Sequence, residues 1–349
     1  MLLLNQQFKK QQLANGGAIF LRPKIADNSA YLPNRPIWGY TPDGNSLGIN
    51  TRFERRLSGF VDDEHGGNCG IVLDMTQPAL GGGPSWKVWM NLANNGAYRA
   101  EFEAIENAWQ PHYRIKTNIA VPIDLTMHTC FTVSRPTNHV AGTTTNPNTL
   151  QEDGPQHLLM QVHPHDDNLA GDGDQALDVT PWDALAMGNT SLSIYTKGPS
   201  ATFGTPVWPR TTLIDDINTP FAQGKRLRIL YRARFTKSAD GFTEVYTKWV
   251  DPVNRIIEPW VLRYTYFGAT MHPDNINYNP YTRIGDYAFD NQSWGDISAA
   301  DGAGIERNGI RRFELYYEDM IWGDETNDPR YAGMSISDIL ERNGYQLTT

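Results

Sequence analysis

The sequence has few cysteines, no long apolar segment and no excess of positive charge. The 349 residues include two cysteines, Cys69 and Cys130, which excludes a disulfide framework and a multi-cysteine metal site and leaves a single bridge between them open. No apolar run approaches the roughly 20 residues of a membrane-spanning helix. The formal net charge of -9 argues against a nucleic-acid surface. We therefore expect neither a membrane nor a nucleic acid as the partner.

The composition is typical of a turn-rich, aromatic β protein. Charged residues make up 20% of the chain, and it contains 31 Gly, 22 Pro, 16 Tyr and 10 Trp. Short runs of β-branched and aromatic residues between turn residues predict strands. They lie at residues 70–75, 86–93, 98–105, 112–123, 126–134, 157–163, 191–198, 226–237, 242–250, 281–287 and 311–324. A short helix is predicted at residues 335–345, with Ser337 as the N-cap and Gly344 as the stop.

Many short strands, with no internal repeat and no sharp change of composition, predict one all-β domain over residues 1–349. We expect a two-sheet β-jelly roll, a concanavalin-like sandwich with a concave substrate groove that fits a long polymer. Residues 1–60 are predicted to form a loop-rich N-terminal segment. Residues 326–349 are predicted to form a C-terminal extension that carries the short helix. Alternation along residues 226–235 predicts one buried and one basic face.

One predicted strand has an unusual face. In YTRIGDY, residues 281–287, the two-residue period of a strand puts Tyr281, Arg283, Gly285 and Tyr287 on one side. Two phenols and a guanidinium around a glycine suit an anionic sugar, since a glycine lets a ligand approach the backbone. We therefore interpret this strand as the centre of a candidate binding site.

YTRIGDY fits the pattern Tyr-x-Lys/Arg-x-Gly-x-Tyr, and three other segments accompany it. YRAEF (98–102) fits an Arg-x-Glu strand, QVH (161–163) a Gln-x-His strand, and RRFELYYEDMIWGD (311–324) a closing strand. In this order the four segments resemble the motifs of jelly-roll polysaccharide lyases, the alginate lyase and heparin lyase I-like superfamily. Two departures bear on the substrate: Arg283 stands where Lys is usual, and Glu103 replaces a second Arg.

The resemblance implies a lyase that cleaves a uronic-acid-containing polysaccharide by β-elimination and leaves an unsaturated sugar at the new non-reducing end. The C5 proton can be removed only when the neighbouring carboxylate is neutralised, as in an oxyanion hole. Arg99, Gln161 and His163 carry donors suited to that task. Tyr287 is the expected proton-transfer residue, with His163 as the alternative base.

The same resemblance implies an anionic polysaccharide as the partner and an extracellular location for this depolymerase. The first ten residues, MLLLNQQFKK, have too short an apolar run for a secretory signal. Export would therefore use a signal absent from this chain, or the protein would leave its cell in a virus particle or by lysis.

Three further residues are expected to contact the substrate or to support those that do: Arg283, Tyr281 and Glu101. Glu101 shares a strand face with Arg99 and would orient it, or the two form an ordinary exposed ion pair. Tyr281 is a packing residue in the simpler interpretation. His163 is likewise a surface histidine in the alternative interpretation.

One acidic loop is a candidate calcium site. Residues 166–174, DDNLAGDGD, supply the carboxylates of Asp166, Asp167, Asp172 and Asp174 together with glycines for a turn. The segment does not match the twelve-residue calcium loop, and a solvated acidic turn is the alternative. Apart from this structural calcium, no cofactor is expected.

Two other function classes stay open. A carbohydrate-binding jelly roll without catalysis, for example a viral adhesion protein, would keep the groove. A glycoside hydrolase would need two carboxylates across the groove, and Glu314 with Glu318 on the closing strand is the best pair available. We otherwise interpret the closing strand as structural. Alginate, glucuronan, a glycosaminoglycan and a bacterial capsule all fit the predicted site as polymers, and any oligomeric state is compatible with the sequence.

Overall fold

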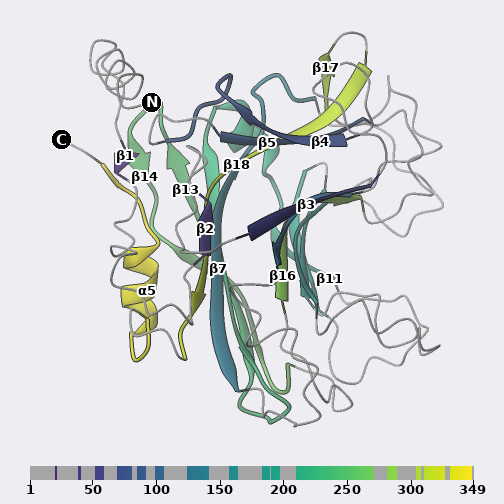
Figure 1. The fold of residues 1–349 in the computed structure, drawn as a ribbon. Helices are drawn as coiled ribbons and strands as arrows, with labels where there is room; N and C mark the ends of the chain where they lie inside the picture. The colour runs from purple at the N-terminus through teal and green to yellow at the C-terminus, as the bar shows by residue number, and fades with distance from the viewer. Residues whose placement is uncertain are drawn as a thin grey trace, which may run out of the picture.

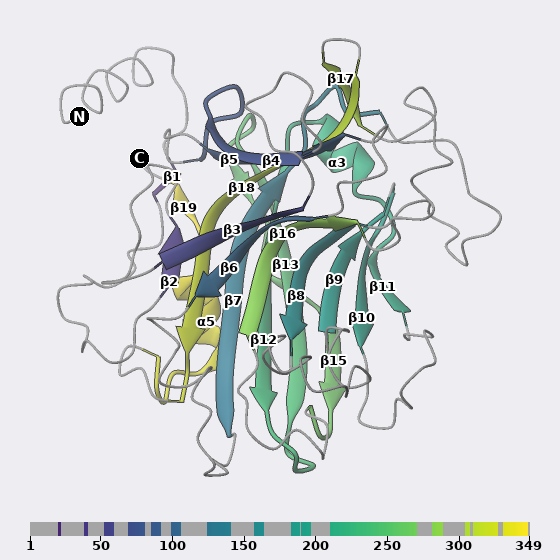
Figure 2. The same cartoon turned by 45° about the vertical axis from the view of Figure 1, so that its right-hand side comes forward.

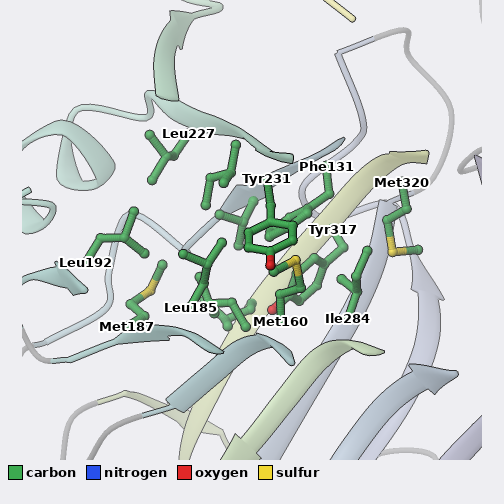
Figure 3. Close-up of a cluster of buried hydrophobic side chains, with 14 of the residues drawn as sticks. Phe131, Met160, Leu185, Met187, Leu192, Leu227, Tyr231, Ile284, Tyr317 and Met320 are labelled. Carbon is green, nitrogen blue, oxygen red and sulfur yellow. The ribbon is translucent and has the colours of Figure 1, made fainter. Parts of the chain in front are cut away.

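Two antiparallel β-sheets pack face to face in the computed structural model, which confirms the all-β sandwich (Figure 1). The core lies between them, and buried side chains from both sheets form one cluster (Figure 3). The structure describes residues 20–21, 38–40, 52–58, 69–80, 85–91, 99–105, 124–140, 157–163, 183–188, 190–196, 210–270, 281–288, 304–307, 310–326 and 331–347.

A 10-stranded sheet forms one layer. Its main path is β14 (Ile256–Ile257), β13 (Phe242–Asp251), β12 (Arg226–Phe235), β7 (Leu125–Ser134), β18 (Ile310–Asp324), β5 (Ser85–Asn91) and β4 (Cys69–Asp74). Off this path, β15 (Val261–Phe267) pairs with β13, while β17 (Ile305–Arg307) and β2 (Trp38–Tyr40) pair with β18.

A 7-stranded sheet forms the other layer. Its order is β11 (Arg210–Ile214), β10 (Leu192–Thr196), β9 (Asp183–Met187), β8 (His157–His163), β16 (Tyr281–Ala288), β6 (Arg99–Ile105) and β3 (Arg52–Ser58). The remaining elements are the strand pair β1 (Phe20–Leu21) and β19 (Gln346–Leu347), with the helices α3 (Asn218–Ala222) and α5 (Ile336–Arg342). None of the described helices is long and apolar enough to span a membrane.

Alternation decides which face of each strand enters the core. In β12, Leu227, Ile229 and Tyr231 join the central cluster, whereas Arg228 points to the outer face of the 10-stranded sheet. The outer face is also buried, because the C-terminal extension packs on it: Ile339 of α5 contacts a second apolar cluster there. The predicted basic face of this strand is therefore buried at Arg226 and Arg228 and partly exposed at Arg232 and Arg234.

The single bridge between Cys69 and Cys130 does not form. Cys130 is a buried free thiol. Cys69 lies in β4 and Cys130 in β7, and β5 and β18 separate these two strands. Strands lie about 4.8 Å apart, so the two residues are beyond the ~7 Å reach of a disulfide.

The C-terminal helix forms, but its predicted start is wrong. Ser335, rather than Ser337, is the N-cap, and its side chain accepts a hydrogen bond from the backbone N–H of Asp338. The Asp338 carboxylate in turn accepts from the backbone N–H of Ser335, which completes a capping box. The C-cap is Asn343, directly before the predicted stop at Gly344.

Two predictions from the sequence fall wholly or mostly on residues that the structure does not describe. The strand predicted at 112–123 lies outside the described residues, as does most of the segment 1–60. Strands that the patterns did not single out include β3, β9, β11 and β15. That the chain is one domain stays a prediction.

Candidate functional site

The strands that carry three of the four motifs are neighbours in the 7-stranded sheet. β16, with YTRIGDY, lies between β8, with the Gln-x-His segment, and β6, with the Arg-x-Glu segment. Figure 2 shows β16, β8, β9, β10 and β11 side by side. The fourth motif, in β18, belongs to the other sheet. Segments far apart in the sequence therefore meet on three adjacent strands.

The register puts the predicted site residues on one face of these strands. Side chains of directly opposed residues in an antiparallel pair point to the same side of the sheet. The opposed pairs are Tyr287 with Arg99, Gly285 with Glu101, Arg283 with Gln161, and Tyr281 with His163. The face is the outer one, because the alternate residues Ile284, Met160 and Ala100 enter the core. We call this set the site row.

The site row is long, and its two ends are far apart. The strand rises ~3.3 Å per residue, so Tyr281 and Tyr287 lie about 20 Å from each other. Arg99 stands at the Tyr287 end, whereas His163 stands at the Tyr281 end and Gln161 next to it. Tyr287 and His163 therefore do not meet at one sugar ring, as a shared acid and base would require.

A β-bulge shapes the Tyr287 end of the row. Ile284 pairs with Met160 and Tyr287 with Leu158, so two residues of β16 stand opposite Leu159 alone. Gly285 has φ of 152°, a backbone conformation that favours glycine. Bulges of this kind occur next to active sites, where they re-aim a side chain.

The bulge seats Tyr287 on an apolar surface. Its half-buried ring packs against Leu158, Ala184, Ala186 and Tyr195, a cluster on the outer face of β8, β9 and β10. Contact with apolar side chains removes water from one side of the phenol and fixes the position of its ring.

The other predicted site residues lie on β6, β8 and β16. Gln161 is fully buried in β8, opposite Ala184 of β9 as well as Arg283. Arg99 and Glu101 lie on β6, His163 lies at the end of β8, and Tyr281 and Arg283 lie on β16.

Three residues behind the row were not predicted as part of the site: His157, Asp286 and Tyr317. Asp286 occupies a core-facing position of β16 and lies 2.7 Å from His157, and Tyr317 of β18 donates its hydroxyl to the carbonyl oxygen of Gly285 at 2.5 Å. A signal for Asp286 exists in the sequence. It follows Ile284 at the strand period, so it is a charged residue on the face that must be buried.

A buried acid also lies between the sheets, away from the site row. Asp183 of β9 accepts hydrogen bonds from the hydroxyls of Tyr231 at 2.5 Å and Thr243 at 3.0 Å. Burial raises the pKa of Asp183 to about 6, although both hydroxyls oppose the shift. Asp183 pairs with the core residue Val162, so it faces away from the row.

The carboxylates considered for hydrolysis are on the wrong side of the molecule. Glu314 is buried and pairs with Arg307, with Nε 2.6 Å from Oε1. Glu318 is buried and pairs with Arg226 at 2.5 Å. Both lie on the outer face of β18, because Leu315 and Tyr317 take the core face. Two paired, covered carboxylates do not flank a substrate.

The calcium candidate, with Asp166, Asp167, Asp172 and Asp174, lies outside the described residues. Within the part of the chain that the structure describes, no three His, Cys, Asp or Glu side chains gather in a way that would hold a metal ion.

Solved structures with a similar fold include polysaccharide lyases. An endo-β-1,4-glucuronan lyase from the fungus Trichoderma reesei is 15% identical, over 80% of this chain and 100% of that one, with a TM-score of 0.45. Alginate lyase A1-II′, a member of polysaccharide lyase family 7, is 13% identical, over 83% and 94% of the two chains, with a TM-score of 0.37. A variant of alginate lyase Aly36B in complex with alginate trisaccharide is 6% identical, over 83% and 99%, with a TM-score of 0.37. No family model matches the chain, and no curated protein sequence matches it. At these identities the similarity concerns the fold.

Proposed function

We propose that this protein is a polysaccharide lyase that cleaves a uronic-acid-containing polymer by β-elimination. The observation that carries the proposal is the register of β6, β16 and β8, which aligns phenols, guanidiniums, an amide and an imidazole in one row. Such a row matches what the reaction needs, namely cations and donors for a carboxylate and a phenol for the proton.

The reaction would proceed at the Tyr287 end of the row. Arg99, directly opposite Tyr287, neutralises the uronate carboxylate and so stabilises the charge that develops when C5 loses its proton. Tyr287 takes that proton. The C5–H and C4–O bonds break, a C4–C5 double bond forms, and the glycosidic oxygen leaves with the proton that the Tyr287 phenolate took from C5.

Tyr287 is favoured over His163 as the base because of the bulge and the apolar seat. The bulge and the apolar surface under the ring both lie at this end of the row. At the other end, Arg283, Tyr281 and His163 would contact further sugars of the same anionic chain. Gln161, opposite Arg283, is fully buried and would support Arg283 rather than touch a sugar. A row of about 20 Å is long enough for more than one sugar.

One observation favours the Tyr281 end of the site row as the place of the reaction. Tyr281 stands opposite His163, next to Arg283 and Gln161, so a phenol and an imidazole are neighbours there. If that end performs the chemistry, Tyr281 rather than Tyr287 transfers the proton.

The test is an absorbance assay for the unsaturated product on alginate, glucuronan and a glycosaminoglycan. We expect wild-type protein to form product on at least one polymer, and Tyr287→Phe to lose about 10²- to 10⁴-fold in kcat while still binding the polymer. Tyr281→Phe should mainly raise KM. The reverse result would move the reaction to the His163 end.

The same assay separates the other function classes. New reducing ends without the ultraviolet absorbance would indicate a hydrolase. Binding without either product would indicate a carbohydrate-binding jelly roll and would refute the lyase. An extracellular location and a structural calcium belong to the same proposal and need secretion and calcium-binding measurements.

A further inference from the structure

The bulge in β16 depends on a buried pair on the core side of the sheet. Nδ1 of His157 lies 2.7 Å from Oδ1 of Asp286, and both side chains are buried. The His157 ring stacks on Phe313 of β18, with 3.4 Å between ring centroids and 8° between planes. A residue of the opposite sheet therefore holds the imidazole in place.

The bulge and the pair require each other. Regular pairing beyond Ile284 and Met160 would bring His157 opposite Tyr287 and move it to the outer face. The bulge instead puts Leu158 opposite Tyr287, and His157 turns inward to Asp286. The contact between His157 and Asp286 is therefore specific to the register that gives Tyr287 its apolar seat. Buried polar contacts of this kind can specify a register.

A second contact holds the glycine of the bulge. Tyr317 is fully buried and donates its hydroxyl to the carbonyl oxygen of Gly285 at 2.5 Å. Tyr317 and Phe313 lie on the same face of β18, two strand periods apart (Figure 3 shows Tyr317 in the core beside Ile284). The closing strand thus reaches Gly285 directly through Tyr317, and Asp286 only through His157, which stacks on Phe313.

We propose that His157, Asp286 and Tyr317, which we call the bulge clamp, are positioning residues for proton transfer by Tyr287. The inference rests on the proposed lyase function. The clamp fixes the backbone at Gly285 and Asp286 from behind, so that the phenol of Tyr287 stands opposite Arg99 in the only register that seats it on the apolar cluster.

The energetics agree with a positioning role. Oδ2 of Asp286 has no hydrogen-bond partner among the described residues, although the residue is fully buried. A buried oxygen without a partner costs stability, so a carboxylate is a poor choice for stability alone. Small errors of placement are expensive in catalysis: a shift of about 1 Å can lower a rate about 100-fold.

The chain offers a matched control for the hydroxyl of Tyr317. Tyr345 is also buried, also donates its hydroxyl at 2.5 Å, and also serves a bulge, in this case to Asp319 in β18. Asp319 lies on the outer face of the 10-stranded sheet, away from the site row. Tyr317→Phe and Tyr345→Phe each remove one buried hydroxyl from one bulge.

The experiment measures kcat, KM and the thermal midpoint of both variants on the polymer that wild-type protein cleaves. We expect Tyr317→Phe to lower kcat at least about tenfold with KM within about twofold, because one misaligned group suffices to slow the reaction. Tyr345→Phe should lose at least as much stability, because its hydroxyl also contacts Thr132 and Arg228, and should keep the wild-type kcat. Equal kcat values for the two variants would overturn the proposal that the bulge clamp positions Tyr287.

A second series tests Asp286 by rescue. Asp286→Asn keeps an oxygen that accepts from His157, whereas Asp286→Leu removes it. We expect the Asn variant to keep kcat within about fivefold and the Leu variant to lose about 100-fold in kcat, with polymer binding kept in both. Equal losses in the two variants, or a loss confined to KM, would refute positioning. Wild-type protein that forms no unsaturated product would refute the lyase itself and any catalytic role of the clamp with it.

Discussion

The outer faces of the two sheets carry polar residues in opposite ways. On the 10-stranded sheet, Arg226 pairs with Glu318, and Arg228 donates to the backbone of Asn343 at 2.5 Å, all of them buried. The C-terminal extension contacts Arg228, and Pro78 and Leu80 contact the Arg226–Glu318 pair. On the 7-stranded sheet, the site row contains phenols, guanidiniums and amides beside an apolar seat for Tyr287.

The difference separates polar residues that hold the fold from polar residues that would act on a ligand. Both faces show strand alternation in the sequence, with polar or charged residues at many of the outward positions. The charges of the 10-stranded sheet are paired within the protein, whereas the proposed function assigns those of the site row to a ligand. Loss of a charge should therefore cost stability on one face and activity on the other.

The largest effect is expected from breaking the buried pair of the 10-stranded sheet. Arg226→Leu leaves Glu318 buried without its cation, and removing one partner of a buried pair costs about 3–5 kcal/mol. Burial already raises the pKa of Glu318. We expect a large drop in the free energy of unfolding in urea, with kcat unchanged at temperatures where the variant is folded.

An exposed ion pair of the same strand provides the control for Arg226. Arg234 lies 2.8 Å from Asp240, with 35% and 58% of the two side chains exposed. Exposed pairs contribute little, so Arg234→Leu should leave the urea midpoint nearly unchanged. Equal losses for both variants would mean that burial does not distinguish the two pairs.

On the outer face of the 7-stranded sheet we expect the opposite result, a loss of activity with little loss of stability. Arg99→Gln removes the cation opposite Tyr287, and losing one donor to a developing negative charge costs about 10²- to 10³-fold in kcat. Its free energy of unfolding should stay close to that of wild type. A variant that unfolds as readily as Arg226→Leu would place Arg99 in a structural network, and the comparison of the two faces would fail.

A smaller effect is expected from the acid between the sheets. The folded-state pKa of Asp183 is about 6, above the ordinary value near 3.8, so the folded protein holds a proton that the unfolded chain releases. The stability from this proton is fully present below about pH 4 and is lost as pH rises through about 6. Two pKa units correspond to about 3 kcal/mol.

Asp183→Asn should remove this pH dependence. The amide is neutral throughout and its oxygen still accepts from Tyr231, so the variant gains stability over wild type as pH rises from about 4 to 6. Urea unfolding at pH 4.5, 6 and 8 measures the difference. A constant difference across this range would show that Asp183 titrates like an exposed carboxylate.

The sequence predicts much of the fold because the strand patterns are local. β8 is found at the predicted residues 157–163, and β7, β12 and β13 match to within two residues at most ends. The face shared by Arg283, Gly285 and Tyr287 also follows from the strand period. Pairing between strands is not local, so the distance between Tyr287 and His163 could not be read from the motifs.

β-Bulges account for the clearest differences between the predicted and the observed faces of the strands. Regular alternation along the closing strand predicts that Glu318 and Asp319 face opposite sides, with only the Asp319 side half-buried. In the structure Asp319 has φ of 49°, and the pairing with β7 shifts between Glu318 and Ile321. Both carboxylates then reach the outer network, and Met320 takes the core position. The hydroxyl of Tyr345 that supports this bulge comes from a distant segment.

The smallest effect is expected at the helix that covers the 10-stranded sheet. Ser335 caps α5 and accepts from the N–H of Asp338, so Ser335→Ala should cost about 1 kcal/mol, the usual loss for an N-cap. The matched control is Ser337→Ala, which lies on the exposed side of the first turn and replaces serine with a better helix former. We expect Ser337→Ala to be neutral or slightly stabilising, and both variants to keep the wild-type kcat. Because α5 shields the buried charges rather than the site row, a change in kcat from either variant would show that the two faces of the sandwich are coupled.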